Sequence, residues 1–416
     1  MLLSRLLLPL ILGTFATAFV SLISRRRIPS EGGRNRWRDR DTVINTPPRA
    51  AASALEQLKN QQREAKKRLQ EETVQRSYHE HLDKLADGDA DAVSKLGRVD
   101  KWEALSAGLT ISADGYAPLA RQPHVLGADD AAASRDRLHR HGYDMVTTER
   151  FDWATFGVDF AAIGKTMDNL VAAGWPPVFI FMYDEPWKVC ARLFDLMAPL
   201  LADEELALEH SMYAWALQRP EGSLESAGKE KVGTVGFGTP HRDITYSNCH
   251  GSDGGPDILS LWIPVVDVDP HNGCMFVIPR ESDPQFDKDV AKKDQDPFSH
   301  RFPYEAVTPL APAAAGSALI WHPNLIHWGS ACKTTSVLPP RKSIAMAFRV
   351  RDARRPSTEK EISRYGRAPM TRDEMLNGGP DLTQRIRMIA KAIQLYNVWY
   401  PLYEGFEIDL IDSSKN

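Results

Sequence analysis

The stretch Thr239-Pro240-His241-Arg242-Asp243 constrains the fold of this chain most strongly, because it sets two kinds of metal ligand one residue apart. On an extended strand alternate side chains share a face, so His241 and Asp243 are expected to point together and Arg242 to point away. Two histidines and one carboxylate on one face of iron(II) leave coordination positions open, an arrangement that suits an oxygenase. Such a site needs a second histidine from elsewhere in the chain.

Two late histidines compete for that place, in Trp321-His322-Pro323-Asn324-Leu325-Ile326-His327-Trp328-Gly329-Ser330. Pro323 restrains the backbone of His322, whereas His327 stands just before a glycine turn. We expect His327 to be the ligand and keep His322 as the alternative.

The segment Arg341-Lys342-Ser343 offers a carboxylate clamp, because Arg341 and Ser343 share a strand face. A guanidinium presents two parallel donors to a carboxylate, and the hydroxyl adds a third. Together they are expected to hold the far carboxylate of 2-oxoglutarate while its keto-acid end binds Fe(II), with O2 as the second co-substrate. Arg349, farther along the same face, is the alternative clamp. The opposite face, expected to pack against helices, carries Ile344, Met346, Phe348 and Val350.

Short apolar runs separated by residues that favour turns predict a barrel or two-sheet sandwich of jelly-roll type. Asn272-Gly273, between two such runs, predicts a hairpin. Helices are expected over 158–173, closed by Gly174, over 187–201, with Asp184 as its cap, and over 381–400, with Asp381 and Gln384 as a capping box. The expected strands are residues 178–183, 211–217, 258–266, 274–278, 318–321 and 343–350.

Four elements in order resemble the phytanoyl-CoA dioxygenase family of iron(II)/2-oxoglutarate oxygenases. They are His241-Arg242-Asp243, Asn272-Gly273-Cys274-Met275-Phe276-Val277-Ile278-Pro279, His327-Trp328-Gly329-Ser330 and Arg341-Lys342-Ser343-Ile344. The resemblance implies a mainly β fold with flanking helices (α+β), built on a double-stranded β-helix (jelly-roll/cupin-like) core. It also implies His241, Asp243 and His327 as iron ligands and Arg341 as the oxoglutarate clamp.

One departure lies after Pro279. The family continues with Gly-Ser-His, and this chain has Arg280-Glu281-Ser282. That turn is expected near the barrel mouth, so substrate and partner contacts cannot be transferred from relatives there.

Other residues have both a functional and a structural interpretation. Trp262 could line the oxoglutarate site or belong to the core. Tyr246 and Asn248 follow the metal-binding stretch and could contact substrate, or form a hydrogen-bonded loop. His250 and His271 are expected on the surface.

Composition narrows the function classes. The chain is 43% hydrophobic and 25% charged, and its formal net charge of -4 gives no general attraction to nucleic acid or anionic membranes. None of the four cysteines forms a CxxC pair, which argues against a zinc knuckle and a disulfide framework and favours reduced thiols. These are Cys190, Cys249, Cys274 and Cys332.

The N-terminus has the character of a targeting segment. Residues 6–23 are apolar and form either a signal peptide cleaved after Ala18 or a membrane anchor whose following arginines stay cytosolic. Residues 19–49 are rich in arginine and poor in acids, as in a transit peptide. Signal plus transit segment resembles the bipartite plastid presequences of algae with complex plastids, so we expect plastid import, with an endoplasmic-reticulum anchor as the alternative.

The chain is expected to divide into four parts: a presequence (1–49), a solvated helical arm and mixed region (50–150), an oxygenase domain (151–352) and a C-terminal helix packed on it (353–416). The expected activity is hydroxylation or desaturation of a small organic substrate such as a lipid or pigment. Two alternatives stay open: a non-catalytic binding or assembly protein of the same fold, and a barrel metalloenzyme that uses no oxoglutarate.

Overall fold

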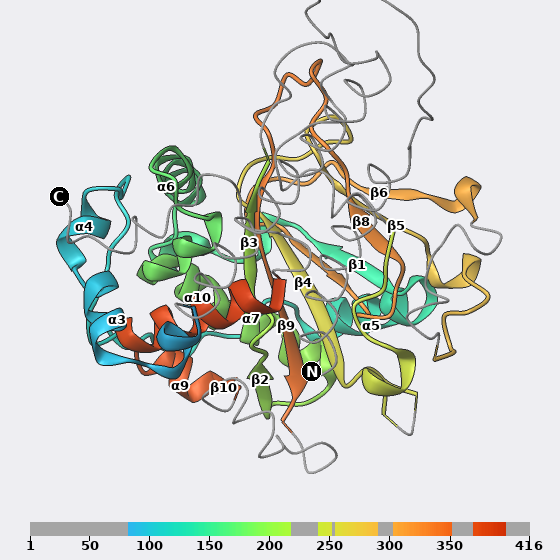
Figure 1. Cartoon of the computed structure of the whole chain (residues 1–416). Coiled ribbons are helices and arrows are strands. Elements are labelled where there is room, and N and C mark those ends of the chain that lie inside the picture. Colours follow the sequence, from blue (N-terminus) through green and yellow to red (C-terminus); the bar gives the residue numbers. More distant parts are fainter. Residues whose placement is uncertain (1–81, 218–239, 252–253, 290–302, 352–368, 397–416) are drawn as a thin grey trace, which may run out of the picture. The chain divides into compact units, whose positions relative to one another are not determined.

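The computed structural model describes residues 82–217, 240–251, 254–289, 303–351 and 369–396. All of these residues belong to one compact unit, residues 68–416. Two antiparallel sheets form its centre (Figure 1). The larger has the order β1-β7-β4-β9-β2-β10, with β3 also paired to β9, and the smaller has the order β6-β5-β8. Antiparallel sheets with flanking helices confirm the expected α+β fold with a jelly-roll core.

The strand bounds are close to those expected from the sequence for most runs. They are β1 (Tyr143–Val146), β2 (Leu206–Leu208), β3 (Tyr213–Ala216), β4 (Ile258–Pro264), β5 (Met275–Val277), β6 (Thr308–Leu310), β7 (Ala318–Trp321), β8 (His327–Gly329), β9 (Lys342–Val350) and β10 (Met370–Thr371). The helices are α3 (Ala90–Leu96), α4 (Val99–Glu103), α5 (Ala128–His141), α6 (Phe160–Ala172), α7 (Asp184–Leu201), α9 (Arg372–Leu376) and α10 (Leu382–Tyr396).

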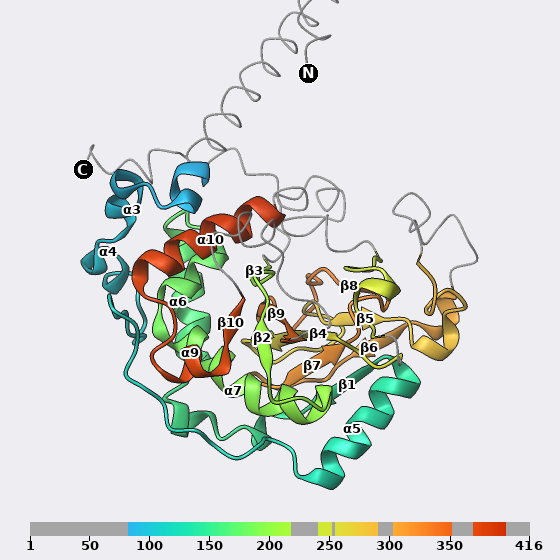
Figure 2. The same cartoon turned by 90° about the horizontal axis from the view of Figure 1, so that it is seen from below.

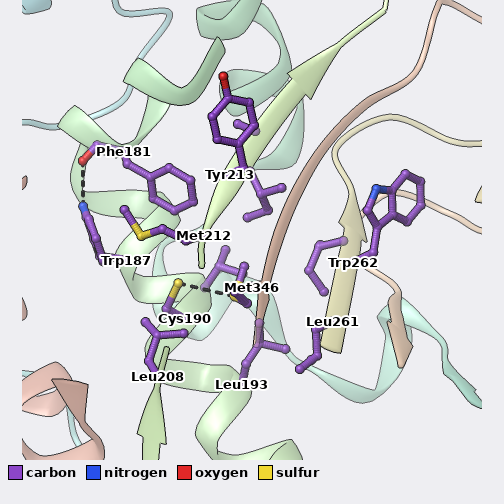
Figure 3. Packing of buried hydrophobic residues seen from close by; sticks show 14 of the residues in the cluster. Phe181, Trp187, Cys190, Leu193, Leu208, Met212, Tyr213, Leu261, Trp262 and Met346 are labelled. Carbon is purple, nitrogen blue, oxygen red and sulfur yellow. Dashed lines mark hydrogen bonds between the residues drawn. The ribbon is translucent and has the colours of Figure 1, made fainter. Parts of the chain in front are cut away.

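One face of the larger sheet packs against α7, as predicted for the apolar face of β9. The Phe348 ring meets Phe194 edge-on at 4.8 Å, and Met346 Sδ lies 3.5 Å from Cys190 Sγ. Figure 3 shows Cys190 and Leu193 of α7 directed toward this side of β9, with Leu261 and Trp262 on opposite sides of β4. Trp262 therefore belongs to the other face, which we call the inner face and which also carries Ser343 and Ala345.

One strand prediction and the hairpin prediction were wrong. The run at 178–183 forms a 3₁₀ helix, Pro177–Met182, and not a strand. Every side chain from Val178 to Met182 is buried, so the run carries no periodicity that separates a buried helix from a buried strand. Asn272-Gly273 does turn the chain, but β4 and β5 lie in different sheets, so the turn joins two sheets and makes no hairpin.

The solvated-arm prediction fails for the part of the arm that the structure describes. Leu82, Leu85 and Leu96 are buried in the main core, and the Arg387 side chain of α10 donates to the Ala86 carbonyl at 3.1 Å. Leu82 and Leu85 are three residues apart on one helical stretch, and Leu96 belongs to the buried side of α3, a pattern that the abundant charges of the segment obscured. Figure 2 shows α3 beside α10. The four-part division of the chain stays a prediction, and within the described residues β1 joins the same sheet as the later strands.

The helix-cap predictions had different outcomes. Asp381 and Gln384 exchange the two hydrogen bonds of the capping box at the start of α10. Asp184 is not a cap, because Tyr183 holds that position. Its buried carboxylate instead pairs with Arg385 of α10 at 2.7 Å and accepts a bond from the Ser112 hydroxyl. Within the described ranges, no helix combines the length and apolar character needed to cross a membrane; residues 6–23 lie outside them.

Candidate metal and co-substrate site

His241 and His327 lie side by side on adjacent backbone segments. Their main chains exchange two hydrogen bonds of 3.0 Å, which form an isolated antiparallel bridge at β8. This bridge extends the smaller sheet by one chain segment beyond β8. Asp243 follows on a short loop whose position is fixed because the backbone N–H groups of Asp243 and Ile244 both donate to the Pro323 carbonyl, at 2.8 and 3.2 Å.

The side chains of His241, Asp243 and His327 converge. One ligand atom from each lies within 4.8 Å of the others, and within the described part of the chain this is the only group of three or more His, Cys, Asp or Glu residues so arranged. Asp243 Oδ1 is 3.6 Å from His241 Nε2, and Asp243 Oδ2 is 3.5 Å from His327 Nε2. Ligands about 2.1 Å from a common ion lie roughly 3 Å apart, so a small contraction would complete a metal site.

Hydrogen bonding prepares His327 for coordination through one nitrogen. Its Nδ1 lies 3.0 Å from the Leu325 carbonyl, which can only accept, so Nδ1 carries the proton and Nε2 keeps its lone pair toward Asp243. Burial lowers the pKa of His327 to about 4. Partial loss of hydration would by itself raise the pKa of Asp243, but the neighbouring His327 and His241 imidazoles outweigh this effect and lower that pKa. At neutral pH His327 is thus a neutral imidazole that faces the ionised Asp243 carboxylate.

Arg242 points away from this site, as alternation predicted. Its guanidinium forms a buried ion pair with Asp283 at 2.6 Å and donates to the Asn324 carbonyl. Because Arg242 is fixed on the far side, its two neighbours are held facing His327. The sequence analysis did not predict the ion pair of Arg242. The signal in the sequence was an arginine placed between a histidine and an aspartate that are both metal-ligand types.

The alternative histidine, His322, lies outside the converging group. Its ring stacks on His250 with centroids 4.9 Å apart and an interplanar angle of 4°. His250 is buried, so its surface assignment was wrong: it is sandwiched between His322 and Tyr246, whose ring lies 4.0 Å away. Burial lowers the pKa of both histidines. His271 is exposed, as expected.

Arg341 lies just before β9 with its guanidinium between the two sheets. Nη1 donates to the Gly273 carbonyl at 2.8 Å, and Cζ lies 5.7 Å from the centre of the Trp262 ring. A Cβ on Gly329 would come within 2.5 Å of Nη1. Gly329 of the His-x-Gly-Ser motif is therefore glycine because the guanidinium occupies that space, a role that sequence reasoning did not assign.

Ser343 shares the inner face with Trp262, and Arg349 lies farther along it. Ser343 is fully buried, and its Oγ has no hydrogen-bond partner among the described residues. Arg349, the alternative clamp, forms an ion pair with Glu209 at 2.9 Å. The structure thus places Arg341, Ser343 and Trp262 together, whereas Arg349 is already paired with the Glu209 carboxylate.

Tyr246 and Asn248 form a short 3₁₀ turn after Asp243. Tyr246 is half-buried on the His250 ring, and Asn248 is exposed. The turn Arg280–Ser282, where the family pattern is broken, attaches to α5: Glu281 pairs with His141 at 2.7 Å, and Arg280 donates to the His139 carbonyl at 2.9 Å. Arg280 and Glu281 therefore have a structural role, because they connect the end of β5 to α5.

All four cysteines are free thiols and buried, in agreement with the composition. Burial raises the pKa of Cys274 to about 11 and that of Cys190 further. Neither thiol is poised as a nucleophile or a metal ligand at neutral pH.

Three solved structures illustrate what the chain is similar to. The epimerase SnoN, in complex with Fe3+, alpha ketoglutarate and nogalamycin RO, is 18% identical, with 55% of this chain and 88% of that chain covered and a TM-score of 0.38. EctD from S. alaskensis with 2-oxoglutarate and 5-hydroxyectoine is 16% identical, with 67% and 96% covered and a TM-score of 0.36. The non-heme monooxygenase ThoJ is 14% identical, with 63% and 99% covered and a TM-score of 0.39.

A search of curated proteins gave no match. The sequence profile described as phytanoyl-CoA dioxygenase (PhyH) matches residues 111–343, more than half of the chain, and includes the stretches that carry His241, Asp243, His327 and Arg341. The chain belongs to the phytanoyl-CoA dioxygenase family and is an iron(II)- and 2-oxoglutarate-dependent dioxygenase acting on a small molecule.

Proposed function

We propose that His241, Asp243 and His327 hold iron(II) and that Arg341 and Ser343 hold the far carboxylate of 2-oxoglutarate. The observation that carries this proposal is the convergence of three ligand atoms within 4.8 Å. Two imidazoles and one carboxylate are the donor set that suits iron(II) with open positions for a co-substrate and dioxygen.

The residues of the inner face fit an oxoglutarate carboxylate. The Arg341 guanidinium is buried, with room left for it by Gly329, and the unpartnered hydroxyl of Ser343 supplies a further donor on the same face. The planar guanidinium matches a carboxylate bound through both oxygens, and such a ligand offsets part of the cost of burying the charge. Trp262, beside Arg341, would form one wall of this position.

When bound, iron(II) and 2-oxoglutarate supply the oxidising power needed to remove hydrogen from an unactivated carbon. The protein's own residues provide geometry. The Leu325 carbonyl orients His327, Pro323 fixes the Asp243 loop, and Trp321 packs on the His327 ring at 4.9 Å. The Asp243 side chain is 41% exposed, so substrate would approach from its side of the site, where Tyr246 and Asn248 are candidate contacts.

We propose hydroxylation or desaturation of a lipid, pigment or other small metabolite. The test is succinate formation from 2-oxoglutarate in purified protein with Fe(II), alongside a metabolite comparison of cells with and without the gene. Arg341→Met should lose oxoglutarate turnover and keep metal binding. Activity that survives without oxoglutarate would favour the barrel metalloenzyme alternative, and protein that binds neither iron nor oxoglutarate would favour a binding or assembly role.

We further propose plastid import through residues 1–49, with an endoplasmic-reticulum anchor and membrane association before processing as the alternative. The apolar stretch and the following arginine excess support this proposal. The formal net charge of -4 supports the proposal that nucleic acid is not a binding partner. Fusing residues 1–49 to a fluorescent protein in an algal cell would test the address, because retention in the reticulum would exclude plastid delivery.

A further inference from the structure

The aromatic side chains of β3 border the inner face beside Ser343. In the β3–β9 ladder Trp215 stands opposite Ser343 and Tyr213 opposite Ala345. Directly opposed residues of antiparallel strands point to the same side of the sheet. Trp262 reaches Ala345 from the other neighbour, β4. Ser343 and Ala345 therefore form a narrow floor with aromatic rings on both sides.

The backbone next to Trp215 confirms this direction. Leu217 donates its backbone N–H to the Arg341 carbonyl at 2.9 Å, and its Cδ1 would lie 2.5 Å from a Cβ on Gly273, the residue whose carbonyl binds Arg341. Leu217 and Trp215 alternate with Ala216, so both share the side of the sheet on which the guanidinium lies. Trp215 thus stands opposite Ser343 of the proposed clamp and two residue positions along the ladder from Arg341.

The C-terminal helix supports this pair of rings. Tyr396, the last residue of α10, meets Tyr213 at 4.5 Å and Trp215 edge-on at 5.9 Å. Both β3 rings are buried, and among the described strands β3 pairs only with β9. Tyr396 lies beyond residue 343, where the family match ends, so this support is a feature of the present chain that the family assignment does not describe.

We propose that Trp215 forms the lateral wall of the oxoglutarate site and that Tyr396 is a positioning residue that holds Trp215 in place. This inference rests on the proposed function. The indole would contact the methylene chain of the co-substrate and exclude water from the Arg341–carboxylate pair, which is stronger in a low-dielectric setting. Tyr396 would act only through the indole, by removing rotamer freedom that binding otherwise has to restrict.

The experiment measures equilibrium binding of 2-oxoglutarate to the full chain loaded anaerobically with Mn(II), by calorimetry, with Mn(II) affinity and thermal stability measured in parallel. Tyr396→Ala should weaken oxoglutarate binding about three- to tenfold and leave Mn(II) affinity unchanged. Tyr396→Phe, which keeps the ring, should restore wild-type affinity. Trp215→Ala should weaken binding further, and adding Tyr396→Ala to it should have no additional effect.

Ile389→Ala is the matched control, because it removes a buried side chain of α10 outside the Tyr396–Trp215 contact. It should lower thermal stability without changing oxoglutarate affinity. Equal weakening by Ile389→Ala, or wild-type affinity in Tyr396→Ala, would overturn the positioning role. Failure of the wild type to bind oxoglutarate would instead overturn the proposed function together with this inference.

Discussion

Gly329→Ala is the substitution for which the structure gives the clearest expected magnitude. The new Cβ would lie 2.5 Å from Arg341 Nη1 and 3.0 Å from Nη2, whereas unstrained contacts with carbon need about 3.5 Å. The guanidinium must therefore shift by roughly 1 Å, which would disturb its alignment with a bidentate carboxylate. A hydrogen bond to a charged group contributes about 1.5–3 kcal/mol.

Losing one such bond weakens 2-oxoglutarate binding by roughly ten- to hundredfold, since about 1.4 kcal/mol corresponds to a factor of ten. The assay is calorimetric titration of 2-oxoglutarate into the Mn(II)-loaded variant under nitrogen, followed by KM for 2-oxoglutarate in succinate formation. Mn(II) affinity should not change. Gly127→Ala is the control, because a Cβ there meets nothing within 4 Å at a φ of -65°. A folded Gly329→Ala protein with oxoglutarate affinity within about twofold of wild type would refute the assignment of Arg341.

Three further predictions follow from other parts of the structure. Alanine at any proposed iron ligand (His241, Asp243 or His327) should abolish succinate formation and stoichiometric iron binding. Normal turnover by all three variants would refute the assignment of the iron site. Burial lowers the pKa of His322 to about 3, and the neighbouring His250 and Arg280 add to this effect. Below about pH 6.5 the unfolded chain therefore binds a proton at His322 that the folded chain does not bind until near pH 3. The free energy of unfolding should fall by up to about 1.4 kcal/mol for each pH unit across that range. His322→Phe keeps the stack and should flatten the acid side of a Tm-against-pH curve, which an unchanged slope would contradict. Arg385→Met should lower the free energy of unfolding by about 3–5 kcal/mol in urea titrations, because it leaves the buried Asp184 carboxylate without its cation, and a loss below about 1 kcal/mol would show that the pair is not critical.

Local pattern predicted the elements whose side chains alternate or recur. The periodic apolar positions of α6 and α10 gave helices, and the alternation around Arg242 gave its outward direction. The order of the four motifs gave the fold class and the family. Within each run and each motif the signal depends on residues close together in the chain, where periodicity and side-chain chemistry alone are informative.

Long-range burial decided the rest. Whether the run Val178–Met182 became strand or helix depended on what surrounds it, because all its side chains are buried. The stacking of His250 on His322 joins segments that are far apart in the chain. The sequence by itself determined which side chains could hold a metal and a carboxylate. Only the tertiary structure decided that His327 rather than His322 faces Asp243 and that Gly329 leaves space for Arg341, since both depend on how two sheets face each other and no local pattern records that distance.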